Sequence, residues 1–160
     1  MRKSGYNRIK AVEYAAKWTY SRNPKYYNFD GLGGDCTNFI SQAIFAGCGV
    51  MNYTPIWGWY YIDIKNRAPS WTAVKYLYEF LTKNGNEGPY ACPAKKSELE
   101  IADLVQLKRG RHFTHSLIIT KIEGDRLFIA SHSYDSFDNP LSNYIYDDIR
   151  YLHILGSRKI

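Results

Sequence analysis

GGDCTNF, residues 33–39, is the stretch that decides the fold of this 160-residue chain. Its two glycines permit backbone conformations that other residues rarely adopt. The apolar spacing after them predicts a helix over residues 36–46, closed by Gly47. Cys36 therefore falls in the first turn of a helix, on the stripe of side chains that packs against the rest of the protein.

The position of Cys36 predicts a nucleophile. Free backbone N–H groups and the positive end of the helix dipole favour a thiolate, which is the reactive form of cysteine. The same N–H groups can hold the oxyanion that forms when a carbonyl carbon is attacked. Cys48 and Cys92 have no comparable setting, so we interpret both as structural.

Helices and strands are segregated along the chain. Apolar residues at helical spacing predict two more helices, over residues 6–20 and 71–83, with Ser70 as the N-cap of the second. Alternating residues then predict short strands over residues 103–107, 115–122 and 126–130, and one or two more over 144–149 and 151–155. This order predicts a single α+β domain over residues 1–160, with N-terminal helices packed on a C-terminal antiparallel sheet.

A cysteine nucleophile needs a base within hydrogen-bond reach, and His115 opens the most apolar strand. If Ile122 pairs with Leu127 across the hairpin turn, His115 and His132 lie on one face of the sheet as diagonal neighbours. His132 is then the group that orients the base. A turn of different length would turn His132 away, and Asp135 would be the next candidate.

Composition limits the partners. The net charge of +6 and the pI near 9.1 favour an anionic partner, but no Lys/Arg run exceeds two residues, so no nucleic-acid-binding stripe is expected. The three cysteines are too few and unpaired for a disulfide framework, and the chain has no CxxC spacing, so no metal or cofactor is expected.

The chain shows no targeting signal. Residues 1–10 are polar and basic, unlike a signal peptide, and no apolar stretch has the length of a membrane span. We therefore expect synthesis in the cytoplasm and no membrane insertion.

Aromatic residues make up 16% of the chain. Four of them lie close together in the sequence: Trp57, Trp59, Tyr60 and Tyr61. In one interpretation they form a surface that contacts sugar or peptide, and in the other they belong to the core.

The sequence resembles the amidase-domain family of the papain-like, NlpC-type cell-wall hydrolase clan. The matching stretches are Tyr6–Arg8, Ala11–Ala15, Asn23-Pro24 with Tyr26 and Phe29, Gly34–Gln42 (GDCTNFISQ), Ser70–Thr72, Asp103–Leu107 (DLVQL) and His115-Ser116. They cover most of the chain in the family's order, and the GDCTNF block is the most specific of them.

The resemblance implies a papain-like fold and metal-free hydrolysis of an amide bond in peptidoglycan. It maps the nucleophile to Cys36, its base to His115 and the third polar residue to His132. Asp35, directly before the nucleophile, and Tyr26 or Tyr27 are candidates for oxyanion or substrate contacts. Members of the family often stand beside other modules in secreted or phage lytic proteins, so we expect action at the cell wall after release or as part of a larger protein.

The sequence therefore predicts a cysteine amidase or peptidase that cuts peptidoglycan through an acyl-enzyme, either as an N-acetylmuramoyl-L-alanine amidase or as a stem-peptide endopeptidase. Anionic wall polymers are possible additional partners, because the chain is basic. Two alternatives stay open. One is a cysteine protease, deamidase or acyltransferase that acts on a protein, and the other is a non-catalytic glycan-binding module.

Overall fold

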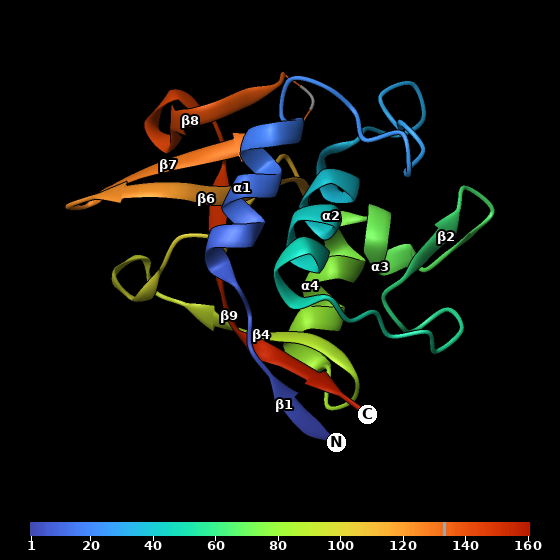
Figure 1. The fold of residues 1–160 in the computed structure, drawn as a ribbon. Coiled ribbons are helices and arrows are strands. Elements are labelled where there is room, and N and C mark those ends of the chain that lie inside the picture. The colour runs from blue at the N-terminus through green and yellow to red at the C-terminus, as the bar shows by residue number, and fades with distance from the viewer. Residues whose placement is uncertain (133) are drawn as a thin grey trace.

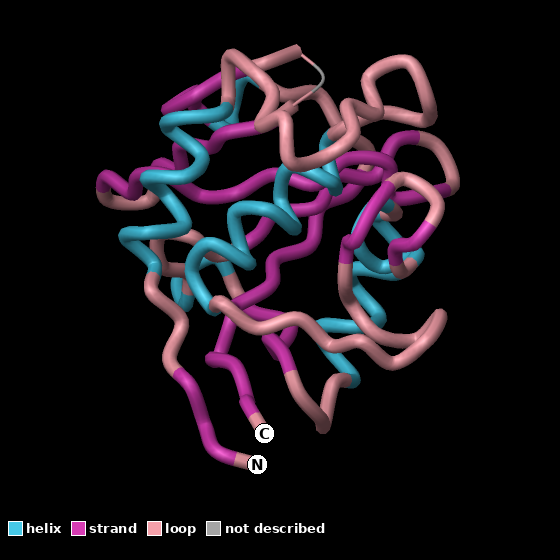
Figure 2. The backbone as a smooth tube through the Cα atoms, turned by 45° about the vertical axis from the view of Figure 1, so that its right-hand side comes forward, coloured by secondary structure: helices cyan, strands magenta, loops and turns pink. Residues whose placement is uncertain are grey.

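The computed structural model describes residues 1–132 and 134–160 and places helices over one face of an antiparallel sheet (Figure 1; Figure 2). The helices are α1 (Arg8–Trp18), α2 (Cys36–Cys48), α3 (Pro69–Thr72) and α4 (Val74–Lys83). The strands are β1 (Arg2–Ser4), β2 (Tyr61–Asp63), β3 (Asn66–Arg67), β4 (Gly88–Ala94), β5 (Leu104–Arg109), β6 (His112–Glu123), β7 (Arg126–Ser131), β8 (Ser136–Pro140) and β9 (Asp148–Lys159). The predicted α+β class, with helices and an antiparallel sheet, is confirmed.

The main sheet has the order β1-β9-β5-β6-β7-β8, and β4 pairs with β9 as well. The two chain ends lie side by side because β1 pairs with β9. One hydrophobic cluster fills the space between helices and sheet and includes Leu104 and Ile118, whereas Val105 and Leu117 belong to a second cluster. Because successive side chains of a strand point to opposite faces, these two clusters cover the two faces of the sheet.

Two helix boundaries differ from the prediction. Helix α2 continues past Gly47. The Tyr6 ring packs against this glycine so closely that a Cβ atom at position 47 would be 2.6 Å from a Tyr6 ring carbon. Gly49, with φ 70°, ends the helix instead. The predicted helix over residues 71–83 is two helices, because Ala73 has an extended backbone, and Ser70 is not its N-cap, since its hydroxyl donates to the Gly58 carbonyl.

The strands at the C-terminal end also differ. The one or two strands predicted over 144–149 and 151–155 are the single long strand β9, which begins only at Asp148. Strand β4 was not expected because it contains Pro89 and Pro93. It pairs only with β9, and such an edge position tolerates prolines because the lost N–H need not reach a second neighbour.

The β6–β7 hairpin corrects the predicted placement of His132. Ile122 faces Leu127 as expected, but the register shifts between Ile119 and Lys121. A shift of one residue moves a side chain to the other face of a sheet. His132 consequently lies on the helix side, whereas His115 lies on the opposite side, so the prediction that the two share a face is wrong.

A buried carboxylate ties α1 to the sheet. Asp103 accepts hydrogen bonds from Arg8 Nη1 at 2.7 Å, from the Ile154 backbone at 2.9 Å and from the Glu100 backbone at 2.8 Å. His153 Nδ1 lies 2.7 Å from its second oxygen, which gives this histidine a structural partner.

Within the described residues, no helix is both long and apolar enough to cross a membrane.

Candidate active site

The loop before α2 aims Cys36 at the sheet. Gly33 and Gly34 have φ values of 82° and 98°, which few residues other than glycine adopt. Asp35 follows as the N-cap residue, but its side chain accepts no hydrogen bond from the backbone N–H groups of the first turn. The first-turn N–H groups of α2 therefore receive no side-chain cap, and an α-helix leaves such groups without an internal partner.

The Cys36 sulfur lies against the start of β6. It is 3.9 Å from the Thr114 carbonyl oxygen and 3.7 Å from the Thr37 hydroxyl, and the Ser116 backbone N–H donates to it. These contacts lie on both sides of His115 in the sequence. The Thr37 hydroxyl is in turn 3.1 Å from that of Ser116, so the helix start and the strand are locked together.

Burial controls the protonation of this thiol. Cys36 is 9% exposed, and burial raises its pKa above the ordinary value, although hydrogen bonds from Ser116 and Thr37 act in the opposite direction. Burial therefore opposes the thiolate that the helix start is expected to favour.

His115 also lacks a charge at neutral pH. Burial, with a contribution from the positive charge of Arg109, lowers its pKa to about 4. Its ring centroid lies 6.1 Å from that of Tyr144, on the face of the sheet away from α2. Both Cys36 and His115 are described, and no hydrogen bond joins them. Burial thus favours the neutral form of both the thiol and the imidazole.

His132 is held by the loop that precedes the nucleophile. Its Nδ1 lies 2.6 Å from Asp35 Oδ2, and its ring stacks on Phe39 with centroids 3.9 Å apart. Its Nε2 lies 2.9 Å from the Trp18 carbonyl oxygen and 3.1 Å from Arg22 Nη1. His132 has no hydrogen bond to His115 in this structure, so the orienting contact predicted between them is absent from these described residues.

Asp135, the alternative candidate for orienting His115, also binds other residues. It accepts hydrogen bonds from Arg22 at 3.0 and 3.1 Å, and Arg22 binds the exposed Asp30 at similar distances. Arg22 therefore joins both aspartates to the His132–Asp35 pair. This network stabilises the loop before Cys36 and does not reach His115.

Two of the expected substrate contacts are buried. Asp35 accepts hydrogen bonds from the Phe29 backbone and from Asn38 in addition to its contact with His132, so its side chain is used within the protein. Trp59 is 0% exposed and donates to the Ser41 hydroxyl. Trp59 therefore belongs to the core, which is one of its two interpretations from sequence, and the Asp35 side chain is engaged within the protein.

The other predicted contacts remain accessible to different degrees. Tyr26 is half-buried and packs on Tyr61. Tyr27 is exposed, and its ring meets the edge of Phe29. Neither tyrosine forms a hydrogen bond with Cys36. Trp57 is 77% exposed and borders a cavity of about 470 Å³. That cavity is also lined by Tyr76, Glu79, Lys83 and Asn86, and none of its residues lines the cavity beside His115.

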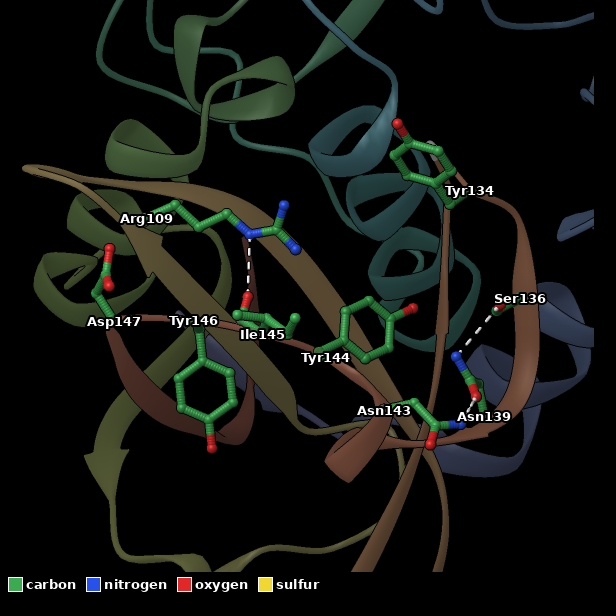
Figure 3. Close-up of a pocket in the computed structure, with 9 residues that line it drawn as sticks. All are labelled: Arg109, Tyr134, Ser136, Asn139, Asn143, Tyr144, Ile145, Tyr146 and Asp147. Atoms are coloured by element: carbon green, nitrogen blue, oxygen red, sulfur yellow. Dashed lines mark hydrogen bonds between the residues drawn. The ribbon is translucent and has the colours of Figure 1, made fainter.

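A cavity of about 570 Å³ that no sequence pattern indicates lies beside Tyr144 (Figure 3). It is lined by Arg109, Tyr134, Ser136, Asn139, Asn143, Tyr144, Ile145, Tyr146 and Asp147. Tyr144 connects it to the His115 ring. Residues 144–146 belong to the strand predicted over 144–149, but in the structure they form a segment before β9. Clusters of three His, Cys, Asp or Glu side chains that could hold a metal are not found in residues 1–132 and 134–160.

The fold and the site define a mixed α+β protein with a buried thiol at a helix start. Residues 5–155 match the family described as "Putative amidase domain", and the chain belongs to this family, whose description indicates amide hydrolysis. The chain is also similar to "Uncharacterized protein YhbB" of Bacillus subtilis (strain 168), with 32% identity over 136 residues, or 82% of this chain. The match spans 42% of the length of that relative. No solved structure matches the chain significantly.

The raised pKa of Cys36 predicts slow alkylation. We expect iodoacetamide to modify Cys36 more slowly near pH 8 than it modifies a free cysteine peptide, because the thiolate fraction is smaller. The rate should continue to rise above the pH at which the free peptide, with a pKa of about 8.5, levels off. Mass spectrometry of the labelled protein measures both rates. Rapid labelling of Cys36 at pH values near 6 would contradict a protonated resting thiol.

Proposed function

We propose that this protein is a cysteine-dependent amide hydrolase of the papain-like, NlpC-type clan, that residues 1–160 form one such domain and that it acts on bacterial peptidoglycan. The observation that supports this most is the position of the Cys36 sulfur, at the start of α2 and against the β6 backbone on both sides of His115. A thiol and an imidazole on adjoining elements are the groups that covalent amide hydrolysis requires. The family's description supports the same reaction class.

Substrate binding starts the proposed reaction. The His115 ring turns from Tyr144 around the edge of β6 before Ile118, where β7 does not pair and where the Cys36 sulfur lies, and its neutral form accepts the thiol proton. The sulfur then forms a bond to the amide carbonyl carbon. The oxyanion that results accepts hydrogen bonds from the uncapped N–H groups of the first turn of α2.

The second half of the reaction returns the enzyme to its starting state. The C–N bond breaks as His115 gives its proton to the leaving amine, which leaves a thioester on Cys36. Water then attacks the thioester carbonyl while His115 takes one of its protons. The C–S bond breaks, a carboxylic acid leaves, and the proton returns to the sulfur.

His132 has a positioning role in this proposal. It holds Asp35, the residue directly before the nucleophile, and therefore fixes the backbone from which Cys36 projects. Arg22 supports the same arrangement through its 3.1 Å contact with His132 Nε2 and its ion pairs with Asp30 and Asp135. A catalytic contact of His132 with His115 is not part of the proposal.

Peptidoglycan is the proposed substrate on three grounds. The ordered motifs resemble those of cell-wall hydrolases, the net charge of +6 favours attraction to anionic wall polymers, and the exposed Trp57 ring can stack on sugar. We propose that the domain reaches the wall after release or as part of a larger protein.

Purified Gram-positive peptidoglycan tests this function. The protein should lower the turbidity of a wall suspension and release new amino groups, and mass spectrometry of the products should show which amide bond was cut. Trp57→Ala should reduce the amount of protein that sediments with the walls. Cleavage of casein but not of muropeptides would favour a protein-directed enzyme, and wall binding without new amino groups would favour a glycan-binding module. Either result would contradict the proposal.

A further inference from the structure

We propose that the cavity beside His115 binds a free carboxylate of an acidic peptide, with Arg109 as the binding residue. The inference rests on the proposed function, because it names the part of the peptide substrate that this site recognises. It concerns Arg109 and the surrounding 570 Å³ cavity, not the nucleophile itself.

Arg109 is a cation without a partner anion. It is exposed at the end of β5, and its side chain makes one hydrogen bond to residues that the structure describes, from Nε to the Ile145 carbonyl at 3.1 Å. Both terminal nitrogens of the guanidinium point into the cavity (Figure 3). Among the described residues, no carboxylate lies within ion-pair distance of them. One guanidinium nitrogen thus holds the side chain in place through a hydrogen bond, and the two terminal nitrogens can donate to a ligand.

The acidic residue of the cavity lining does not neutralise Arg109. Asp147 accepts a hydrogen bond from the Gly110 backbone N–H at 2.5 Å, and its carboxylate lies on the far side of the Arg109 side chain (Figure 3). A ligand carboxylate can therefore reach the guanidinium without displacing an existing ion pair. The planar guanidinium suits this role, since it binds a carboxylate through two parallel N–H···O bonds.

The rest of the lining suits a peptide. The tyrosines Tyr134, Tyr144 and Tyr146 offer apolar ring faces with hydroxyl groups at their edges. Asn143 donates to Asn139 at 2.7 Å, which fixes two amide side chains on the same wall. Tyrosine rings and amides bind a peptide without adding charge, so Arg109 supplies the selectivity for an anion.

The cavity is coupled to the base. Its residue Tyr144 faces the His115 ring, and the charge of Arg109 contributes to the lowered pKa of His115. A carboxylate bound to Arg109 would offset that charge, so His115 would accept the thiol proton of Cys36 more readily. The carboxylate is therefore expected to increase kcat as well as to lower KM.

Two forms of one stem peptide test the proposal. The probes are L-Ala-D-Glu-L-Lys-D-Ala and the same peptide with both carboxylates converted to carboxamides. Titration calorimetry with the Cys36→Ala protein should show roughly 10-fold or tighter binding of the carboxylate form, which is the range of a charged hydrogen bond. Arg109→Gln should abolish this preference. Arg109→Lys should retain part of it, because lysine keeps the charge but lacks the second parallel donor.

Arg111→Gln is the matched control. It removes the same charge from the same β5–β6 turn, but Arg111 does not line the cavity. The preference should be unchanged in this variant. Equal or undetectable binding of the two peptides, or a preference that survives in Arg109→Gln, would overturn the inference. Because these measurements use a protein without the nucleophile, they are independent of whether Cys36 catalyses hydrolysis.

Discussion

Replacing Cys36 with alanine is expected to lower the rate of amide hydrolysis by roughly 10⁴-fold or more, the loss typical of a covalent nucleophile. The sulfur is the atom that attacks the carbonyl in the proposed reaction, and alanine cannot form the thioester. The measurement is the release of amino groups from peptidoglycan per unit time. Circular dichroism and a urea titration show whether the variant is folded.

Cys48→Ala is the matched control for this variant. Cys48 is also buried, and it lies at the opposite end of α2, where its thiol donates to the Val50 carbonyl. Burial raises its pKa to about 11, so it is a poor nucleophile at neutral pH. Its replacement should leave the specific activity unchanged. A folded Cys36→Ala protein with wild-type activity would contradict the role of Cys36.

Replacing Asp35 with alanine is expected to lower the free energy of unfolding by about 3–5 kcal/mol, the cost of removing one partner from a buried polar pair. The change leaves the His132 Nδ1 and the Phe29 backbone N–H without the Asp35 acceptor and removes one of the two acceptors of the Asn38 amide. Urea unfolding measures the loss. We also expect lower activity in the folded fraction, because the loop before Cys36 loses its anchor.

Asp30→Ala provides the comparison for Asp35→Ala. Asp30 binds the same Arg22, but its side chain is 40% exposed, and exposed ion pairs contribute roughly 1 kcal/mol or less. The two variants therefore separate a buried carboxylate from an exposed one within a single network. Similar small losses for both would show that the Asp35–His132 pair does not support the fold as described.

The local features of the site were predictable from sequence. Two glycines followed by an apolar stripe predict both the start of α2 and the direction of Cys36, because each signal lies within a few residues. The class of fold follows from the change from helical to alternating patterns. The end of the helix was less predictable. Glycine is typical of a helix end, but Gly47 lies inside α2, where the Tyr6 ring packs against it.

The features that depend on distant contacts were not predictable. The register shift between Ile119 and Lys121 carries no residue signal, and it alone moves His132 to the helix side of the sheet. The partner of His132 is Asp35, 97 residues away in the sequence. The pKa of Cys36 depends on a competition between a local helix start and burial by tertiary packing, and only the first can be recognised in a sequence.

The neutral resting pair has a consequence for activation. Because burial favours a protonated Cys36 and an uncharged His115, we expect a ligand that changes the surroundings of either group to increase its reactivity. The cavity with Arg109 lies next to His115 and can receive such a ligand. In this account, substrate binding and nucleophile activation are therefore linked through one arginine.

Acid quenching during turnover of a stem-peptide substrate, followed by mass spectrometry of the protein, tests the central claim most directly. The account predicts that the acyl fragment of the substrate is bound to Cys36 as a thioester, and that this species disappears as the acid product accumulates. An acyl group on another residue, or product formation while Cys36 stays unmodified at every quench time, would contradict it.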